Sequence, residues 1–234
     1  KSGKYIFEEL KDFLKSNNFI TNEWNALNVL IQNSSTVGLI DFKLLSIEEN
    51  NNFVFFNKLD KKEFKFLYLL GSDNLQIKKN DEFILYQGSH GDRGAEIADV
   101  VLPSPTYTEQ NGLYSNLEGR VQECRKASYP IGSAMEDWKI FNLILENLNN
   151  TNNLNNFTIL RKEAFNLIVN YSDLKSLPKK EIKNNNKKIG EFFDEKIFIN
   201  KIDYYYSNAI CRSSKTMSDC RNTKKELSKT GTND

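Results

Sequence analysis

The chain contains one histidine, His90, which lies two residues before Asp92. An imidazole beside a carboxylate can act as a general acid or base. No serine or cysteine nucleophile motif accompanies this pair, so we interpret His90 as a hydrogen-bonded turn residue and keep a catalytic role as the alternative. Asp92 and Arg93, within the sequence GDRG, are interpreted likewise as a turn whose charges pair locally.

The three cysteines bear on redox chemistry. An iron–sulfur cluster usually needs four thiolates at short, fixed spacing, whereas Cys124, Cys211 and Cys220 include no C-x-x-C pair. His90 is too distant in sequence to complete a zinc site with them. We therefore predict no iron–sulfur cluster and no metal site in this chain. Cys211 and Cys220 could form a disulfide or stay reduced.

A polar stretch rich in turn formers follows the middle of the chain. Its turn-forming and charged residues are Glu109, Gly112, Asn116, Glu118, Gly119 and Arg120. The pattern suits a loop that folds back on a sheet edge and pairs its own charges. Long loops are usually functional, and subunit contacts count as function, so the residues alone leave two interpretations: a ligand loop, or a packed structural loop, which we place first.

Short apolar runs predict the strands that position these residues. Phe64–Leu70 and Phe83–Gly88 are typical of buried strands, Ser89–Gly94 of a polar turn, and Ala98–Leu102 of a third strand that Pro103 ends. Strands that are apolar on both faces and alternate with helices predict an α/β fold. The expected sheet is mostly parallel and covered on both sides.

Helical periodicity appears at four places. Apolar residues recur on one face over Tyr5–Leu14, Glu23–Gln32 and, most strongly, Asp137–Leu148, and a fourth helix is expected over Phe157–Tyr171. The predicted organisation is an α/β domain over residues 1–148, a helix and polar linker over 149–190, and a C-terminal tail over 191–234.

The region beyond the fourth helix is less regular. Leu174–Ile189 is interpreted as a lysine-rich linker, and Glu191–Tyr206 as a strand or an extended arm. The three tyrosines Tyr204–Tyr206 offer a large, partly polar contact area, which suits an interface or a local core equally.

Composition excludes several classes of partner. With 234 residues, 39% of them hydrophobic, the chain can bury a substantial core. The net charge of +1, with acidic residues between the lysine clusters, argues against nucleic acid. No stretch approaches the roughly 20 apolar residues of a membrane span. The start, KSGKYIFEEL, has no signal or presequence character, so we expect that a leader was removed or that the sequence begins partway through a longer product.

Several motifs together resemble a known family. ADVVLP at Ala98–Pro103, then Glu109, Gly112 and NLEGRVQ at Asn116–Gln122, resemble the late segment of molybdopterin-dependent oxidoreductases. Within that superfamily, GSHGDRGAEIADVVLP at residues 88–103 and EDWKIFNLILENL at Glu136–Leu148 are most similar to the large iron–sulfur subunit of respiratory complex I.

The similarity extends outward from this core. Glu23–Phe42 and Phe66–Asn74 resemble upstream segments of the same subunit, and DYYYSNAICRSSKTMSDC at Asp203–Cys220 resembles the C-terminus of its mitochondrial form. No specific match is seen from about Asn149 to Lys201. The chain would correspond to the C-terminal part of the subunit, in a partial molybdopterin-oxidoreductase-like domain with an extended C-terminal tail.

The resemblance implies a scaffold without a cofactor. Asn116, Glu118 and Arg120 occupy positions that lie near the pterin in active enzymes, and we expect them here to stabilise the loop by hydrogen bonding and charge pairing. Leu113 replaces a threonine of the family pattern, which removes a hydroxyl from the loop. The residues expected to have a structural role in this region are His90, Asp92, Arg93, Asp99, Glu109, Gly112 and Gly119.

The resemblance also implies partners and a location. Iron–sulfur clusters are expected in a cluster-bearing N-terminal half of the subunit. We predict that this half is a second polypeptide, from a separate gene or from processing into two pieces, so that the chain is one half of a split subunit; a first half that is merely omitted from the sequence is the alternative. The other expected partners are further complex I subunits. The expected location is the matrix-side peripheral arm at the mitochondrial inner membrane. The alternatives are the C-terminal piece of an active molybdopterin-dependent oxidoreductase and, more weakly, a free-standing binding module.

Overall fold

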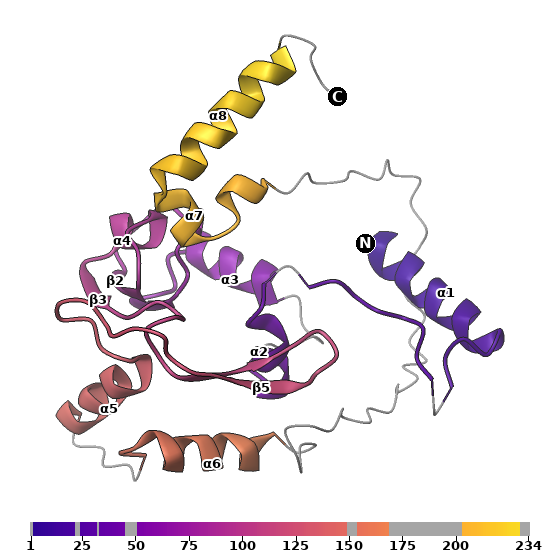
Figure 1. The fold of residues 1–234 in the computed structure, drawn as a ribbon, viewed down its shortest axis with the longest axis horizontal. Coiled ribbons are helices and arrows are strands. Elements are labelled where there is room, and N and C mark those ends of the chain that lie inside the picture. Colours follow the sequence, from indigo (N-terminus) through magenta and orange to yellow (C-terminus); the bar gives the residue numbers. More distant parts are fainter. Residues whose placement is uncertain are drawn as a thin grey trace. The chain divides into compact units, whose positions relative to one another are not determined.

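The computed structural model describes residues 2–21, 24–31, 33–44, 51–148, 154–168 and 203–229. Figure 1 labels the helices and strands along the chain. The chain divides into two compact units. The first unit combines Lys1–Leu45, Tyr114–Gln122 and Leu167–Asn200, and the second combines Ser46–Leu113, Glu123–Asn166 and Lys201–Asp234. The domain boundaries predicted at residues 148 and 190 remain predictions.

A parallel three-stranded sheet lies in the second unit. Its strands are β1 (Phe66–Leu70), β2 (Phe83–Gly88) and β3 (Val100–Pro103), in the order β1-β2-β3. In the parallel register Phe66 lies opposite Phe83, and Leu85 lies opposite Val100. The structure therefore confirms the parallel sheet and all three strands, to within two residues at their ends.

Helices cover both faces of this sheet. On one face a buried cluster combines Leu59 of α3 (Asn51–Asp60) with Leu67, Leu69, Ile77, Ile84 and Tyr86. On the other face the Tyr68 ring stacks on Phe141 of α5 (Asp137–Asn147), with ring centroids 5.5 Å apart. Successive strand residues point to opposite faces, which is why neighbours such as Leu67 and Tyr68 meet different helices. The predicted helix Asp137–Leu148 is confirmed as α5.

The predicted polar turn at Ser89–Gly94 ends earlier than expected. A short helix, α4 (Arg93–Ile97), begins inside it. Asp92 is the N-cap, and its side chain accepts a hydrogen bond from the Arg93 N–H. An aspartate cap is enough to start a helix of one turn, which is too short to leave a periodic apolar pattern.

The predicted long loop is a β-hairpin. β4 (Gly112–Ser115) and β5 (Val121–Cys124) form their own two-stranded sheet. The segment thus contains a pair of strands that the sequence analysis did not predict, and its folding back on a sheet edge remains a prediction. Each strand is only four residues long and mixes polar with apolar side chains, so the sequence carries little strand signal there.

The first unit begins with α1 (Ser2–Ser16), which confirms the helix predicted at Tyr5–Leu14. The helix predicted at Glu23–Gln32 was wrong, because residues 24–31 are not helical. Ile20 instead makes an antiparallel bridge with Asn25, whose Oδ1 accepts a hydrogen bond from the Leu27 N–H at 2.9 Å. Such side-chain acceptors compete with helical hydrogen bonds. The unit's next helix is α2 (Thr36–Asp41).

The remaining helices belong to the second half of the chain. α6 (Phe157–Leu167) confirms the fourth predicted helix over its described part. A 3-10 helix, η1 (Tyr204–Tyr206), leads into α7 (Ala209–Ser213) and α8 (Lys215–Lys229). The linker Leu174–Ile189, and the predicted arm up to residue 202, lie outside the described residues. Within the described parts, no helix combines the length and apolar character that crossing a bilayer requires.

Candidate functional site at the carboxyl end of the parallel sheet

The loops that follow β1 and β2 lie at the same edge of the sheet, because the strands are parallel. Leu70, which ends β1, pairs with Gln87 near the end of β2. Asp73 follows β1, and Asp92 follows β2. In open α/β sheets ligands bind outside the carboxyl ends of the strands, so this edge is the first place to look for a site.

Arg212, which is far from these two loops in sequence, forms ion pairs with both Asp73 and Asp92 at this edge. Arg212 of α7 donates from Nε to Asp92 Oδ2 at 2.5 Å, and its Nη2 lies 3.1 Å from Asp73 Oδ1. The prediction that Asp92 pairs locally was therefore wrong, since its partner is 120 residues away. Arg93 does pair locally, with Glu96 at 3.3 Å. Arg93 and Glu96 are three residues apart, about one helical turn, so the local sequence is enough to bring them together. The pair between Asp92 and Arg212 depends on the tertiary fold.

The Asp92 carboxyl is held in its charged form. Burial raises its pKa, but the hydrogen bonds from Arg212 and from the Arg93 N–H, together with the Arg212 charge, outweigh burial and lower it. The nearby Tyr86 hydroxyl is the opposite case: burial first, and then the charges of Asp73 and Asp92, raise its pKa to about 12. Tyr86 is therefore neutral at physiological pH and serves as a hydrogen-bond donor.

The Asp92 contact predicts a pH dependence. Because the folded pKa of Asp92 lies below its ordinary value of 3.8, the pair stabilises the fold above that pH and is lost as the pH falls through the folded pKa. Asp92→Asn should lower the melting temperature at pH 7 and have a smaller effect at pH 3. Thermal melts of both proteins at the two pH values measure this, and an equal effect at both would contradict it.

His90 lies in the turn at this edge. Its Nδ1 is 3.0 Å from Ser89 Oγ, and its backbone carbonyl accepts a hydrogen bond from the Tyr86 hydroxyl at 3.2 Å. Both contacts shape the turn that carries Asp92. These contacts agree with the prediction that His90 is a hydrogen-bonded turn residue, which remains a prediction.

Two glycines let the backbone approach Tyr86. A Cβ on Gly94 would lie 2.6 Å from the Ser72 carbonyl oxygen and 2.8 Å from Tyr86 ring carbons. A Cβ on Gly88 would overlap the Tyr86 hydroxyl oxygen. The Gly94 N–H also donates to the Asp73 carbonyl at 3.1 Å, which joins the two loops. The edge is therefore closely packed by backbone and the Tyr86 ring.

Asp99 joins β3 to β2 at the opposite end of the strands. Its Oδ2 accepts from the Ile84 N–H at 2.8 Å, and its Oδ1 accepts from Lys79 Nζ at 2.5 Å. The hydrogen bond from Ile84 is the main cause that lowers the Asp99 pKa, and the Lys79 contact adds to it against a small effect of burial. Asp99 thus holds the start of β3 beside β2.

The hairpin between β4 and β5 contains the positions that lie near the pterin in active relatives of the predicted family. Asn116 Oδ1 accepts from the Arg120 N–H at 2.8 Å, and the Asn116 N–H donates to the Arg120 carbonyl at 2.9 Å. Glu118 Oε2 lies 3.5 Å from Asn116 Nδ2. The Asn116 side chain therefore makes its hydrogen bonds inside the turn.

Buried polar side chains outside the hairpin also have hydrogen-bond partners. Within the described residues, no buried side-chain nitrogen or oxygen lacks a hydrogen-bond partner. Glu109 caps a neighbouring turn by accepting from the Thr106 N–H at 3.2 Å, and Gly112 begins β4. All three cysteines, Cys124, Cys211 and Cys220, are free thiols.

Gly119 has a backbone φ of +82°, in the region that favours glycine. Gly119→Ala should therefore destabilise the hairpin by about 1 kcal/mol. Gly38→Ala is the matched control in the same unit: it lies in α2 with no atom within 4 Å of a new Cβ, so alanine should be neutral or stabilising. Urea unfolding curves test the pair, and equal shifts in the same direction would contradict the assignment.

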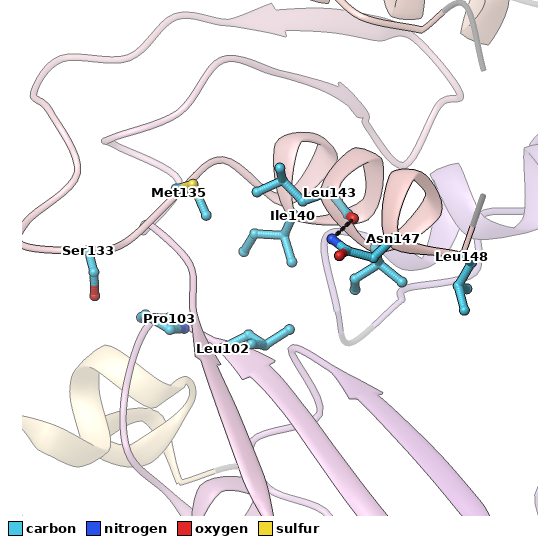
Figure 2. Close-up of a pocket in the computed structure, with 9 residues that line it drawn as sticks. Leu102, Pro103, Ser133, Met135, Ile140, Leu143, Asn147 and Leu148 are labelled. Carbon is cyan, nitrogen blue, oxygen red and sulfur yellow. Dashed lines mark hydrogen bonds between the residues drawn. The ribbon is translucent and has the colours of Figure 1, made fainter. Parts of the chain in front are cut away.

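A second feature of the same unit as the sheet is an apolar pocket of about 340 Å³ between the end of β3 and α5 (Figure 2). Its lining includes Leu102 and Pro103 of β3 and Ile140, Leu143 and Ile144 of α5. No lining residue is titratable, so the pocket offers contact area but no acid–base chemistry.

Sequence comparisons define the class of this fold. A family model for molybdopterin oxidoreductases matches residues 1–147. The chain belongs to this family.

Comparison with individual proteins shows which members of this family the chain resembles. The NADH-ubiquinone oxidoreductase 75 kDa subunit of Reclinomonas americana is 36% identical over 221 residues, which are 93% of this chain and 32% of that protein. The 78 kDa subunit of Candida albicans is 35% identical over 95% of this chain and 31% of its own length. A subunit of the NADH-quinone oxidoreductase of Rickettsia typhi is 35% identical over 89% of this chain and 29% of its own length.

The chain is therefore homologous to the large iron–sulfur subunit of complex I, as its motifs predicted. It spans about a third of the length of these curated relatives.

Sequence reasoning missed the residues that organise this edge. Arg212, Asp73, Tyr86 and Gly94 were given no role, although Gly94 lies in the predicted turn Ser89–Gly94. For Asp73, the available signal was its position shortly after the apolar strand that ends at Leu70. Nothing local in the sequence indicates that Arg212 reaches Asp92.

Proposed function

We propose that this chain is a non-catalytic structural part of the large iron–sulfur subunit in the peripheral arm of mitochondrial complex I, where it supports electron transfer from NADH to ubiquinone. The observation that carries the proposal is the similarity to complex I subunits over 93% of the chain, which includes most of both compact units. The filled carboxyl edge, with Arg212 paired to Asp73 and Asp92, supports a role without a bound cofactor.

Electron transfer would use iron–sulfur clusters held elsewhere. The cysteines of this chain lack cluster spacing, so a cluster-bearing N-terminal polypeptide would supply the thiolates. We further propose that this polypeptide is a separate piece of a split subunit, located with this chain on the matrix side of the inner membrane.

An exposed aromatic pair supports a partner on the second unit. The Phe66 and Phe83 rings stack with centroids 6.1 Å apart, yet their residues are 51% and 46% exposed. Apolar side chains clustered at the surface are typical of a contact with another polypeptide. The remaining part of the subunit, or a neighbouring complex I subunit, would cover them.

Gentle solubilisation of the source membranes, capture of this chain with an antibody and mass spectrometry of what accompanies it test the assignment. Recovery of complex I subunits, including a separate cluster-bearing polypeptide, is the expected result. Recovery of one continuous polypeptide that carries both halves would contradict the proposal of a split subunit but would agree with the structural role. Recovery without complex I subunits would overturn both.

The family match favours one alternative: the C-terminal piece of an active molybdopterin-dependent oxidoreductase. Such an enzyme would carry molybdenum or tungsten in the assembled protein. Elemental analysis of the captured material separates the two proposals, because the scaffold role predicts neither metal in stoichiometric amount.

A further inference from the structure

The described part of the C-terminal tail, residues 203–229, is held together by contacts among its own elements. Its elements η1, α7 and α8 pack on one another. The Tyr206 hydroxyl donates to Ser218 Oγ at 3.0 Å, and the Arg221 guanidinium lies 4.3 Å from the centroid of the Tyr206 ring. Arg221 Nε also donates to Asp203 Oδ2 at 2.5 Å. These contacts tie the start of the tail to α8 without help from the sheet.

Arg212 connects this tail to the sheet. Its Nη1 donates to the Tyr206 carbonyl at 3.1 Å, which fixes the guanidinium within the tail. Its other two nitrogens reach Asp92 at 2.5 Å and Asp73 at 3.1 Å, on the loops after β2 and β1. The side chain is 16% exposed, so these are largely desolvated contacts. Each nitrogen of the planar fork has a partner, a geometry that lysine cannot reproduce.

The contact of Arg212 with Asp73 and Asp92 lies where a parallel α/β sheet usually binds ligands. A parallel α/β sheet offers its carboxyl edge to ligands, and an anionic ligand usually meets the start of a helix there. In this chain the Asp92 carboxylate itself accepts the first N–H of α4. A second anion would be repelled by Asp73 and Asp92. Any ligand would have to displace Arg212 and leave two carboxylates unpaired, which is costly when they are partly buried.

We propose that Arg212 is a latch that fastens the C-terminal tail over the carboxyl edge of the β1-β2-β3 sheet and closes that edge to ligands. The latch stands on the geometry of this chain alone, so it holds whether or not the proposed function in complex I is right. Arg212 is a positioning residue: it orients the tail through Asp73 and Asp92.

Hydrogen–deuterium exchange on the captured assembly tests the latch. Arg212→Gln should speed exchange in residues 203–213 and 88–94 on the order of 10-fold to 100-fold, because opening no longer breaks two ion pairs. Arg212→Lys should fall between that variant and the parent. The matched control is Arg93→Gln, which removes only the exposed pair with Glu96 within α4, and it should leave exchange in residues 203–213 unchanged.

Chemical rescue separates a latch from a general loss of folding. In Arg212→Ala, added guanidinium at concentrations far below those that unfold proteins should restore protection, while an equal concentration of sodium chloride should not. Unchanged exchange in Arg212→Gln would overturn the proposal. So would a rise in exchange of equal size in α5 and in the tail that guanidinium fails to reverse, because Arg212 would then support the whole fold rather than this one contact.

Discussion

Ile84→Ala is expected to destabilise the second unit by about 3–4 kcal/mol. Ile84 lies in β2, the middle strand of the parallel sheet, and its exposed fraction is 0%. It packs in the cluster with Leu59, Leu67 and Tyr86. Removing three carbons there loses burial and leaves a cavity that the flanking strands cannot close. Pulse proteolysis across a urea series on the captured protein measures the change.

Ile131→Ala is the matched control for that substitution. It removes the same atoms from a residue that is 80% exposed, so the free energy of unfolding should change by no more than about 0.5 kcal/mol. Equal shifts of the urea midpoint for the two variants would show that β2 is not the centre of the core.

Gly94→Ala is expected to destabilise the same unit by about 3 kcal/mol. The added methyl would meet the Ser72 carbonyl at 2.6 Å and the Tyr86 ring at 2.8 Å. The first is backbone, and the second belongs to a ring that is itself buried, so neither neighbour can move aside at small cost. Because Gly94 also donates its N–H to Asp73, the substitution should loosen the loop that receives Arg212.

Gly91→Ala controls for the loss of a nearby glycine, in the turn just before α4. No atom lies within 4 Å of a Cβ at that position, so its effect should stay within about 0.5 kcal/mol. The urea midpoints of the two variants provide the comparison. Gly94→Ala behaving like Gly91→Ala would contradict the close approach to Tyr86.

The sequence predicted the sheet well because its signal is local. Phe66–Leu70 is a continuous apolar run of strand length, and Phe83–Gly88 begins with one. Such runs are typical of strands in a parallel sheet that is covered on both faces. The α5 helix was equally visible, since its apolar face repeats over three turns.

Local patterns failed where tertiary contacts or side-chain hydrogen bonds decided the structure. The apolar residues near Leu30 have helical spacing, but Leu30 is 86% exposed and Asn25 holds the backbone in a turn. The pairing of Asp92 with Arg212 could not be predicted, because the two residues are 120 positions apart. The family resemblance matched the tail around Arg212 without giving that residue a role.

The measurement that tests the central claim most directly is depletion of NADH:ubiquinone reductase activity from solubilised source membranes with an antibody against this chain. The account predicts that the activity leaves the supernatant in proportion to the chain and is recovered on the antibody. Full removal of the chain with the activity left behind in solution would contradict its assignment to complex I.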